Sequence, residues 1–123
     1  MDGPTMQSLR ILVVEDDDVI AMLLAEMLTF MGHHVCGTEA TEAGAVKAAE
    51  HWRPEFMLVD AELKEGSGVT AIEAILSKGP MPHVLMSGGA IGSGGWQGPL
   101  LRKPFGERDL IRAIEAVMHR QPR

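Results

Sequence analysis

The hydrophobic pattern of the chain alternates between short, fully apolar runs and longer segments in which apolar residues recur at helical spacing. Residues 11–14, ILVV, form a continuous run rich in β-branched side chains, which is typical of a strand buried on both faces. Residues 19–32 are rich in Leu, Met and Ala and end in Gly32, which predicts a helix and its stop. The same pattern predicts further strands at residues 34–38, 56–60, 83–87 and within 100–105, and further helices at residues 41–52, 69–79 and 106–120.

Strands and helices therefore alternate along the whole chain. This order is the signature of right-handed βαβ units and predicts an α/β fold with a doubly wound parallel sheet. The length of 123 residues fits one domain, and the chain shows no internal repeat or linker.

Composition and charge narrow the classes of function. A hydrophobic content of 46% is enough for a core, and the net charge of −6 argues against general binding to nucleic acid or to an anionic membrane. Cys36 is the single cysteine, so an internal disulfide is excluded and a reducing compartment is expected. No segment resembles a signal peptide or is apolar over a length that spans a bilayer, so we expect a cytoplasmic protein.

Polar residues that could bind a ligand or take part in a reaction follow the predicted strands. Glu15 and Asp16 follow the first strand, Asp60 ends the third, Ser87 ends the fourth, and Lys103 follows the fifth. In open α/β sheets, ligands bind beyond the carboxyl ends of the strands. We therefore expect these five side chains to converge at one edge of the sheet.

Carboxylates that converge repel one another, and a divalent cation relieves that repulsion. Magnesium prefers oxygen ligands, and one or two carboxylates plus phosphate oxygens are its usual partners. Glu15 and Asp16 are candidate ligands for such a magnesium ion, and Lys103 could neutralise charge or hold a phosphate. An aspartate such as Asp60 can also act as a covalent nucleophile and form an aspartyl phosphate.

Each of these residues has a simpler interpretation when it is taken alone. Acids at a helix start are often only caps, and Asp17 and Asp18 fit that role here. Asp60 alone fits a turn after a strand, Ser87 a turn before two glycines, and Lys103 a solvated surface residue. The functional interpretation depends on all of them meeting at one edge.

The segments VVED, LVDAEL with GSG, VLMS and LLRKPF, in this order, closely resemble bacterial response regulator receiver domains of the chemotaxis-regulator type. The resemblance covers about residues 9–118. It implies a five-stranded, flavodoxin-like sheet in the order 2-1-3-4-5 with helices on both faces. It also implies a receiver domain over residues 9–120, with a flexible N-terminus at 1–8 and a tail at 121–123.

The resemblance assigns a role to each acid. Asp60 matches the phosphoacceptor, and Asp16 matches the direct ligand of Mg²⁺, for which Mn²⁺ can substitute. Glu15 matches the companion acid that acts on the metal through water. Glu62 stands where the family offers a backbone carbonyl to the metal.

The remaining site residues match positions that meet the phosphoryl group. Ser87 matches the hydroxyl residue that turns toward it, and Lys103 matches the lysine that pairs with it. Pro104 matches the proline after that lysine, before which a cis bond is typical.

Two features depart from the family pattern. The segment between Ser87 and Lys103 is shorter than in ordinary receivers and rich in glycine, which disfavours helix by about 1 kcal/mol per site relative to alanine. We therefore predict that the fourth helix is short, distorted or absent. Leu100 stands where the family has a switching aromatic residue, and Trp96 is a candidate substitute.

The resemblance implies a stand-alone response regulator rather than an enzyme, with at most slow self-dephosphorylation. A sensor histidine kinase or a histidine phosphotransfer protein would phosphorylate Asp60, and the output would be partner binding or a phosphate sink. The downstream partner is unknown, and a homodimer is compatible with the sequence. Two alternatives stay open. One is a binding module independent of phosphorylation. The other is a phosphohydrolase of the haloacid dehalogenase type, because Asp60-Ala61-Glu62 imitates the pair of acids, two residues apart, that such enzymes use.

Overall fold

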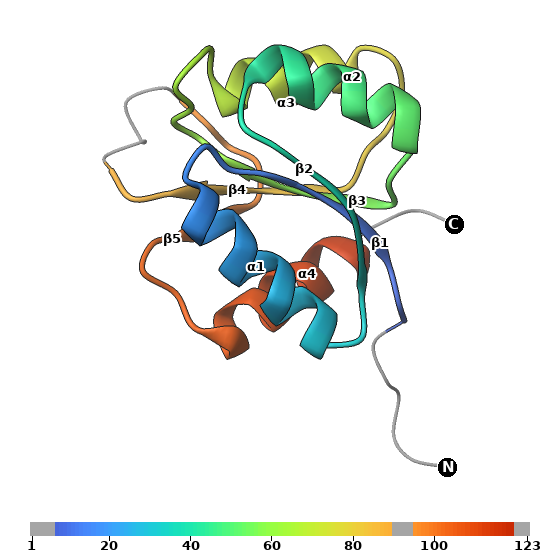
Figure 1. The fold of residues 1–123 in the computed structure, drawn as a ribbon, viewed down its shortest axis with the longest axis vertical. Helices are drawn as coiled ribbons and strands as arrows, with labels where there is room; N and C mark the ends of the chain where they lie inside the picture. Colours follow the sequence, from blue (N-terminus) through green and yellow to red (C-terminus); the bar gives the residue numbers. More distant parts are fainter. Residues whose placement is uncertain (1–6, 90–94, 120–123) are drawn as a thin grey trace.

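The computed structural model describes residues 7–89 and 95–119, which form a three-layer α/β sandwich (Figure 1). A parallel sheet in the order β2-β1-β3-β4-β5 lies between two helical layers, with α2 and α3 on one face and α1 and α4 on the other. The strands are β1 (Arg10–Val14), β2 (His34–Glu39), β3 (Phe56–Asp60), β4 (His83–Ser87) and β5 (Leu100–Arg102). The helices are α1 (Asp18–Phe30), α2 (Glu42–Trp52), α3 (Gly68–Leu76) and α4 (Glu107–His119). The predicted fold class and strand order are confirmed.

The strands are central because their side chains are apolar on both faces. All five residues of β3 are buried, as are four of the five residues of β1 and of β4. Alternate residues feed two cores, so that Leu58 packs below α1 and α4 while Met57 packs below α2 and α3. This double burial explains why the strands read as continuous apolar runs rather than as alternating ones.

Side-chain caps fix where three helices begin, and with them the loops that leave the strands. The carboxylate of Asp17 accepts from the backbone N–H groups of Val19 and Ile20, so the predicted capping role of this acid is confirmed. Thr41 and Ser67 cap α2 and α3 in the same way. Each cap satisfies N–H groups that would otherwise lack a partner at the helix start.

The connection between β4 and β5 departs from a regular βαβ unit. Residues 88–89 and 95–99 form no helix, which agrees with the prediction for this glycine-rich segment, although its central part, residues 90–94, lies outside the described residues. Among the described residues, the helix after β5 is therefore the fourth, α4. The predicted flexible N-terminus and C-terminal tail also lie largely outside the described residues.

Two smaller observations complete the fold. Cys36 is half-buried and directs its thiol toward the carbonyl of Ile11 at 3.5 Å. Within residues 7–89 and 95–119, no helix is both long and apolar enough to cross a membrane.

Candidate functional site

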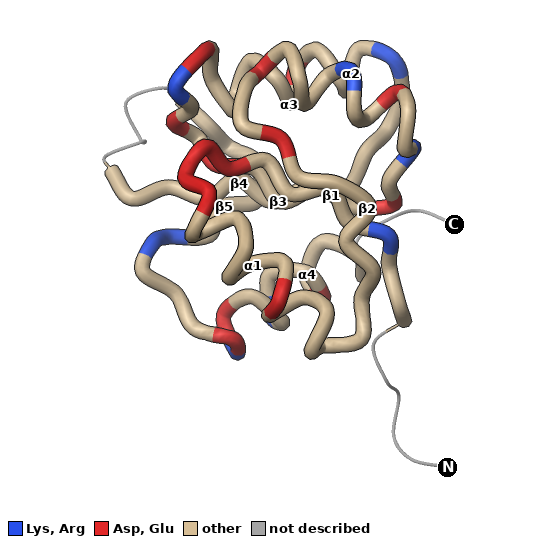
Figure 2. Tube along the Cα trace, in the orientation of Figure 1, with Lys and Arg blue, Asp and Glu red and all other residues tan. Residues whose placement is uncertain are grey.

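Three carboxylates meet at the carboxyl edge of the sheet. Glu15 and Asp16 leave the end of β1, and Asp60 ends β3, which pairs with β1 in parallel. One carboxylate oxygen from each lies within 4.8 Å of the others. Figure 2 shows the acidic residues gathered along this end of the sheet. The adjacency of β1 and β3 therefore brings together acids that are far apart in the sequence.

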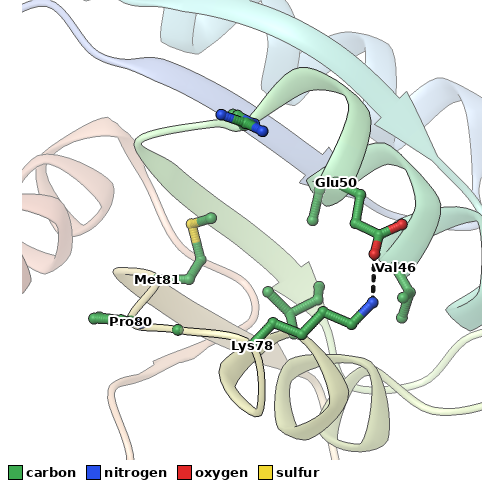
Figure 3. A pocket seen from close by; sticks show the side chains of 9 residues that line it. Val46, Glu50, Lys78, Pro80 and Met81 are labelled. Atoms are coloured by element: carbon green, nitrogen blue, oxygen red, sulfur yellow. Dashed lines mark hydrogen bonds and ion pairs between the residues drawn. The ribbon is translucent and has the colours of Figure 1, made fainter.

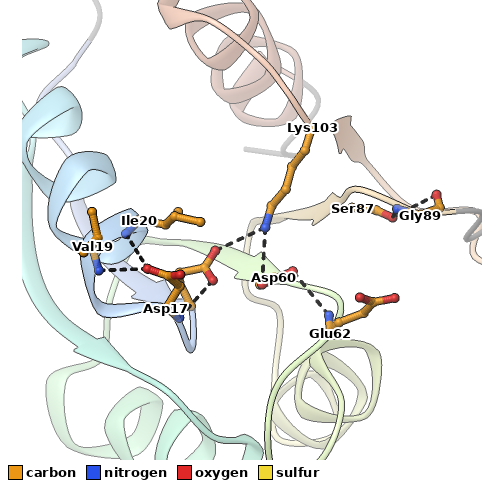
Figure 4. A network of polar contacts seen from close by, with 9 residues as sticks. Asp17, Val19, Ile20, Asp60, Glu62, Ser87, Gly89 and Lys103 are labelled. Atoms are coloured by element: carbon orange, nitrogen blue, oxygen red, sulfur yellow. Dashed lines mark hydrogen bonds and ion pairs between the residues drawn. The ribbon is translucent and has the colours of Figure 1, made fainter.

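Lys103 reaches this cluster from the loop after β5. Its Nζ lies 3.3 Å from Glu15 Oε1 and 3.3 Å from Asp60 Oδ2, so one ammonium group bridges both buried acids (Figure 4). The lysine backbone is held by its N–H group, which donates to the carbonyl of Ser87 at 2.8 Å. The peptide bond between Lys103 and Pro104 is cis, as the resemblance implied.

The electrostatics of the cluster show a site with excess negative charge. Burial raises the pKa of Glu15 to about 7, and the charge of Asp60 contributes to the rise. Burial disfavours the ammonium form of Lys103, but the charges of Asp60 and Glu15 more than offset this, and the pKa of Lys103 is raised. Three carboxylates beside one lysine leave the cluster with excess negative charge, and burial adds to the cost of ionising Glu15.

The carboxyl group of Asp60 is fixed by its neighbours on two sides. Its Oδ1 accepts from the backbone N–H of Glu62 at 3.3 Å, while Oδ2 faces Lys103. The backbone carbonyl of Asp60 lies directly against Gly68, the first residue of α3. The N–H of Gly68 in turn donates to the carbonyl of Ala61 at 3.0 Å. The start of α3 is thus built onto the strand end that carries this carboxylate.

Ser87 lies at the edge of the cluster rather than within its polar contacts. It is buried at the end of β4, one residue beyond Met86, which pairs with Asp60. Its hydroxyl accepts from the N–H of Gly89 at 3.2 Å and lies 3.3 Å from the carbonyl of the same residue. The hydroxyl closes a local turn and would have to rotate to reach a group on Asp60.

Two residues from the sequence prediction belong to or precede the edge strand β5. The ring of Trp96 meets that of His83 edge-on, with centroids 5.9 Å apart, at the start of β4 and so away from the carboxyl edge that carries the acids. Leu100 begins β5 and is 39% exposed. Trp96 is half-buried, packs against the core under α2 and α3, and donates from Nε1 to the carbonyl of Pro99 at 3.3 Å. A role for either residue in switching stays a prediction.

Sequence reasoning missed two features of the site. The close approach of Gly68 to Asp60 gave no signal beyond a glycine at a helix start. The second feature is an apolar surface on α1, the helix that follows the acidic cluster; its exposed residues are Val19, Ile20, Met22, Leu23 and Phe30. Excess apolar residues around the whole helix could have indicated it, since a helix with one buried face needs fewer of them.

The residues present fit a hard divalent cation. Carboxylate oxygens are the ligands that Mg²⁺ prefers, and a 2+ charge would offset both the burial of the Glu15 carboxylate and its repulsion by Asp60, which together raise the pKa of Glu15. Asp16 is half-buried, so the cluster is open to solvent on its side and leaves room for water ligands.

The profile of the response regulator receiver domain family matches residues 11–93. The chain belongs to this family. Receiver domains are the signal-accepting modules of two-component systems, so the resemblance seen in the sequence is confirmed. The matched region ends within the glycine-rich segment, where the chain departs from the family pattern.

Similar proteins include regulators with further sequence beyond the matched region. The transcriptional regulatory protein PdtaR of Mycobacterium tuberculosis is 32% identical over an alignment of 133 positions, gaps included, which covers 98% of this chain and 64% of that protein. The solution structure of the PhyR receiver domain from Erythrobacter litoralis superposes with a TM-score of 0.86 at 29% identity, covering 98% of this chain and 97% of that one. PhyR from Bartonella quintana, described as an anti-anti-sigma factor, superposes with a TM-score of 0.75 at 27% identity, covering 90% of this chain and 47% of that one. The chain thus spans less than two thirds of PdtaR and about half of the Bartonella protein.

Proposed function

We propose that this receiver domain accepts a phosphoryl group on Asp60 in a Mg²⁺-dependent reaction and signals by a change in partner binding. The observation that carries the proposal is the bridging position of Lys103, 3.3 Å from both Asp60 and Glu15, beside three clustered carboxylates. A sensor histidine kinase or a histidine phosphotransfer protein is the proposed donor, as for the family. A phosphate sink is an alternative outcome of the same chemistry.

The transfer would form a bond between an Asp60 carboxylate oxygen and phosphorus, and would break the bond between phosphorus and the donor nitrogen. The leaving imidazole of the donor keeps the electron pair and takes up a proton. Asp16 and Asp60, with the Glu62 carbonyl and with Glu15 through water, would hold Mg²⁺, which supplies charge neutralisation for the transferring group.

Lys103 would exchange partners during the reaction. Its ammonium now pairs with Asp60 Oδ2 and Glu15 Oε1, and a phosphoryl oxygen on Asp60 would compete for it with charge-assisted hydrogen bonds. Rotation of the Ser87 hydroxyl away from Gly89 would give a second contact that exists only in the modified state. Contacts of this kind shift the balance between conformations of the loops that carry them.

The test is uptake of phosphate from acetyl phosphate with and without MgCl₂, read by intact mass and by sensitivity of the product to hydroxylamine. The parent should gain one hydroxylamine-labile phosphoryl group only with Mg²⁺, and Asp60→Asn should gain none. Asp18→Asn is the matched control, because Asp18 is an exposed acid on the same edge outside the cluster. Equal modification of Asp60→Asn would refute the assignment.

The binding-module alternative makes a different prediction. A phosphorylation-independent module would show no change in its amide NMR spectrum when beryllofluoride and Mg²⁺ are added, whereas the proposed receiver would shift around Asp60, Ser87 and Lys103. The receiver family match favours phosphoacceptor chemistry over the phosphohydrolase alternative. The cytoplasmic location and the oligomeric state stay predictions.

A further inference from the structure

A cavity of about 310 Å³ opens between α2 and α3 at the end of the sheet opposite the acidic cluster (Figure 3). Its apolar lining comes from Val46 on α2, Ile75 on α3 and Met81 before β4. Its rim carries the charged residues Glu50, Lys78 and Arg53. The volume is at the small end of the range for ligand sites, roughly 300–1,000 Å³, and an apolar floor with a few charged groups is typical of such sites.

Arg53 holds an unusual backbone conformation at the rim. It ends α2 with a φ of 48°, in the left-handed region that glycine and asparagine occupy with least strain. The described residues offer its guanidinium no hydrogen bond or ion pair. A cation near a helix C-terminus is favourable in general, but that preference is met equally by a lysine or arginine one turn earlier, without backbone strain. The chain thus places a guanidinium that has no partner among the described residues beside an apolar cavity, at a position where glycine would be less strained.

The second cation of the rim, Lys78, is held only by an exposed ion pair. Lys78 pairs with Glu50 across the mouth of the cavity, and the two side chains are 59% and 58% exposed. Exposed ion pairs contribute little to stability, so a competing anion can displace Glu50 at low cost. Arg53 and Lys78 together outnumber the one acid of the rim, which leaves the mouth net positive in a protein whose total charge is −6.

We propose that this cavity binds a small organic anion with an apolar tail, of the class of medium-chain carboxylates. The tail would lie on Val46, Ile75 and Met81, and the carboxylate would pair with Arg53 and Lys78. The site is independent of the proposed phosphorylation chemistry, because it shares no residue with the acidic cluster.

The experiment is a titration of the isotopically labelled protein with sodium octanoate, followed in amide NMR spectra. Saturable shifts should centre on Val46, Ile75 and Met81. Octanol and octylammonium carry the same tail with a neutral or positive head, and both should bind at least fivefold more weakly than octanoate. Equal binding of octanol would overturn the proposal, because it would reduce the cavity to an unspecific apolar hollow. Absence of saturable shifts with octanoate would overturn it as well.

Variants separate binding from folding. Arg53→Gly relieves the left-handed backbone, so its urea midpoint should be no lower than that of the parent, while its affinity for octanoate should fall at least fivefold. Glu50→Gln removes the competing acid and should tighten binding at least twofold. Lys47→Gln, an exposed cation on the same helix that does not line the cavity, should leave affinity unchanged. Unchanged affinity in Arg53→Gly would overturn the assigned role of the guanidinium.

Discussion

Replacement of Gly68 by alanine should destabilise the protein, although alanine is the better helix former. A Cβ on Gly68 would lie 2.8 Å from the carbonyl carbon of Asp60 and 3.1 Å from Cα of Ala61, and would overlap the Asp60 carbonyl oxygen. Ordinary contacts between carbon atoms lie at about 3.5–4.0 Å. All three atoms belong to the backbone at the end of β3, so no flexible side chain can move aside.

The size of the effect follows from these distances. The start of α3 must move by roughly 1 Å relative to β3, and overpacking of this kind costs about 1–3 kcal/mol. The gain in helix propensity, at most about 1 kcal/mol, opposes this cost only partly. We expect a net loss of about 1–2 kcal/mol in the free energy of unfolding. Since the displaced strand end carries Asp60, phosphate uptake from acetyl phosphate should slow by about tenfold or more.

Urea denaturation of Gly68→Ala beside Gly88→Ala measures this effect. A Cβ on Gly88 would meet only the side chain of Lys103, at 3.8 Å, which is ordinary contact. Gly88→Ala should therefore match the parent or exceed it slightly. If Gly68→Ala has the same slope and a midpoint equal to or above that of Gly88→Ala, the close packing of α3 against Asp60 does not constrain the fold and the reasoning is wrong.

Two further predictions concern buried titratable groups. Glu15→Gln should stabilise the metal-free protein by up to about 3 kcal/mol at pH 8.5, because the raised pKa of Glu15, about 7, makes its ionisation unfavourable to folding. The gain should vanish near pH 4.5, where Glu15 is protonated in the folded protein. A variant no more stable than the parent at pH 8.5 would contradict the assignment. His33 is buried, its Nδ1 accepts from the N–H of Leu9 at 3.1 Å, and burial lowers its pKa, so it should cost stability as the pH falls below about 6.5. Urea midpoints at pH 7.5 and 5.5 should differ less in His33→Gln than in the parent, and equal differences would show that His33 does not titrate in this range.

The sequence by itself was enough for the architecture and for the composition of the candidate site. Residues 11–14 and 56–60 read as buried parallel strands because both of their faces are apolar, and parallel strands place their carboxyl ends at one edge. That single rule predicts that Asp16 and Asp60 lie close together. The dense glycines after Ser87 predicted a weak or missing helix for a local reason, namely the high entropy of glycine in a helix.

Tertiary structure alone decided how these parts meet. The bridging of Glu15 and Asp60 by Lys103 depends on the stacking order of three strands, and the contact of Gly68 with the Asp60 backbone depends on the docking of α3. The cavity beside Arg53 exists only because α2 and α3 end next to each other in space. Local sequence encodes periodicity and capping, whereas burial, pKa shifts and cavities arise from atoms that the chain brings together over long sequence separations.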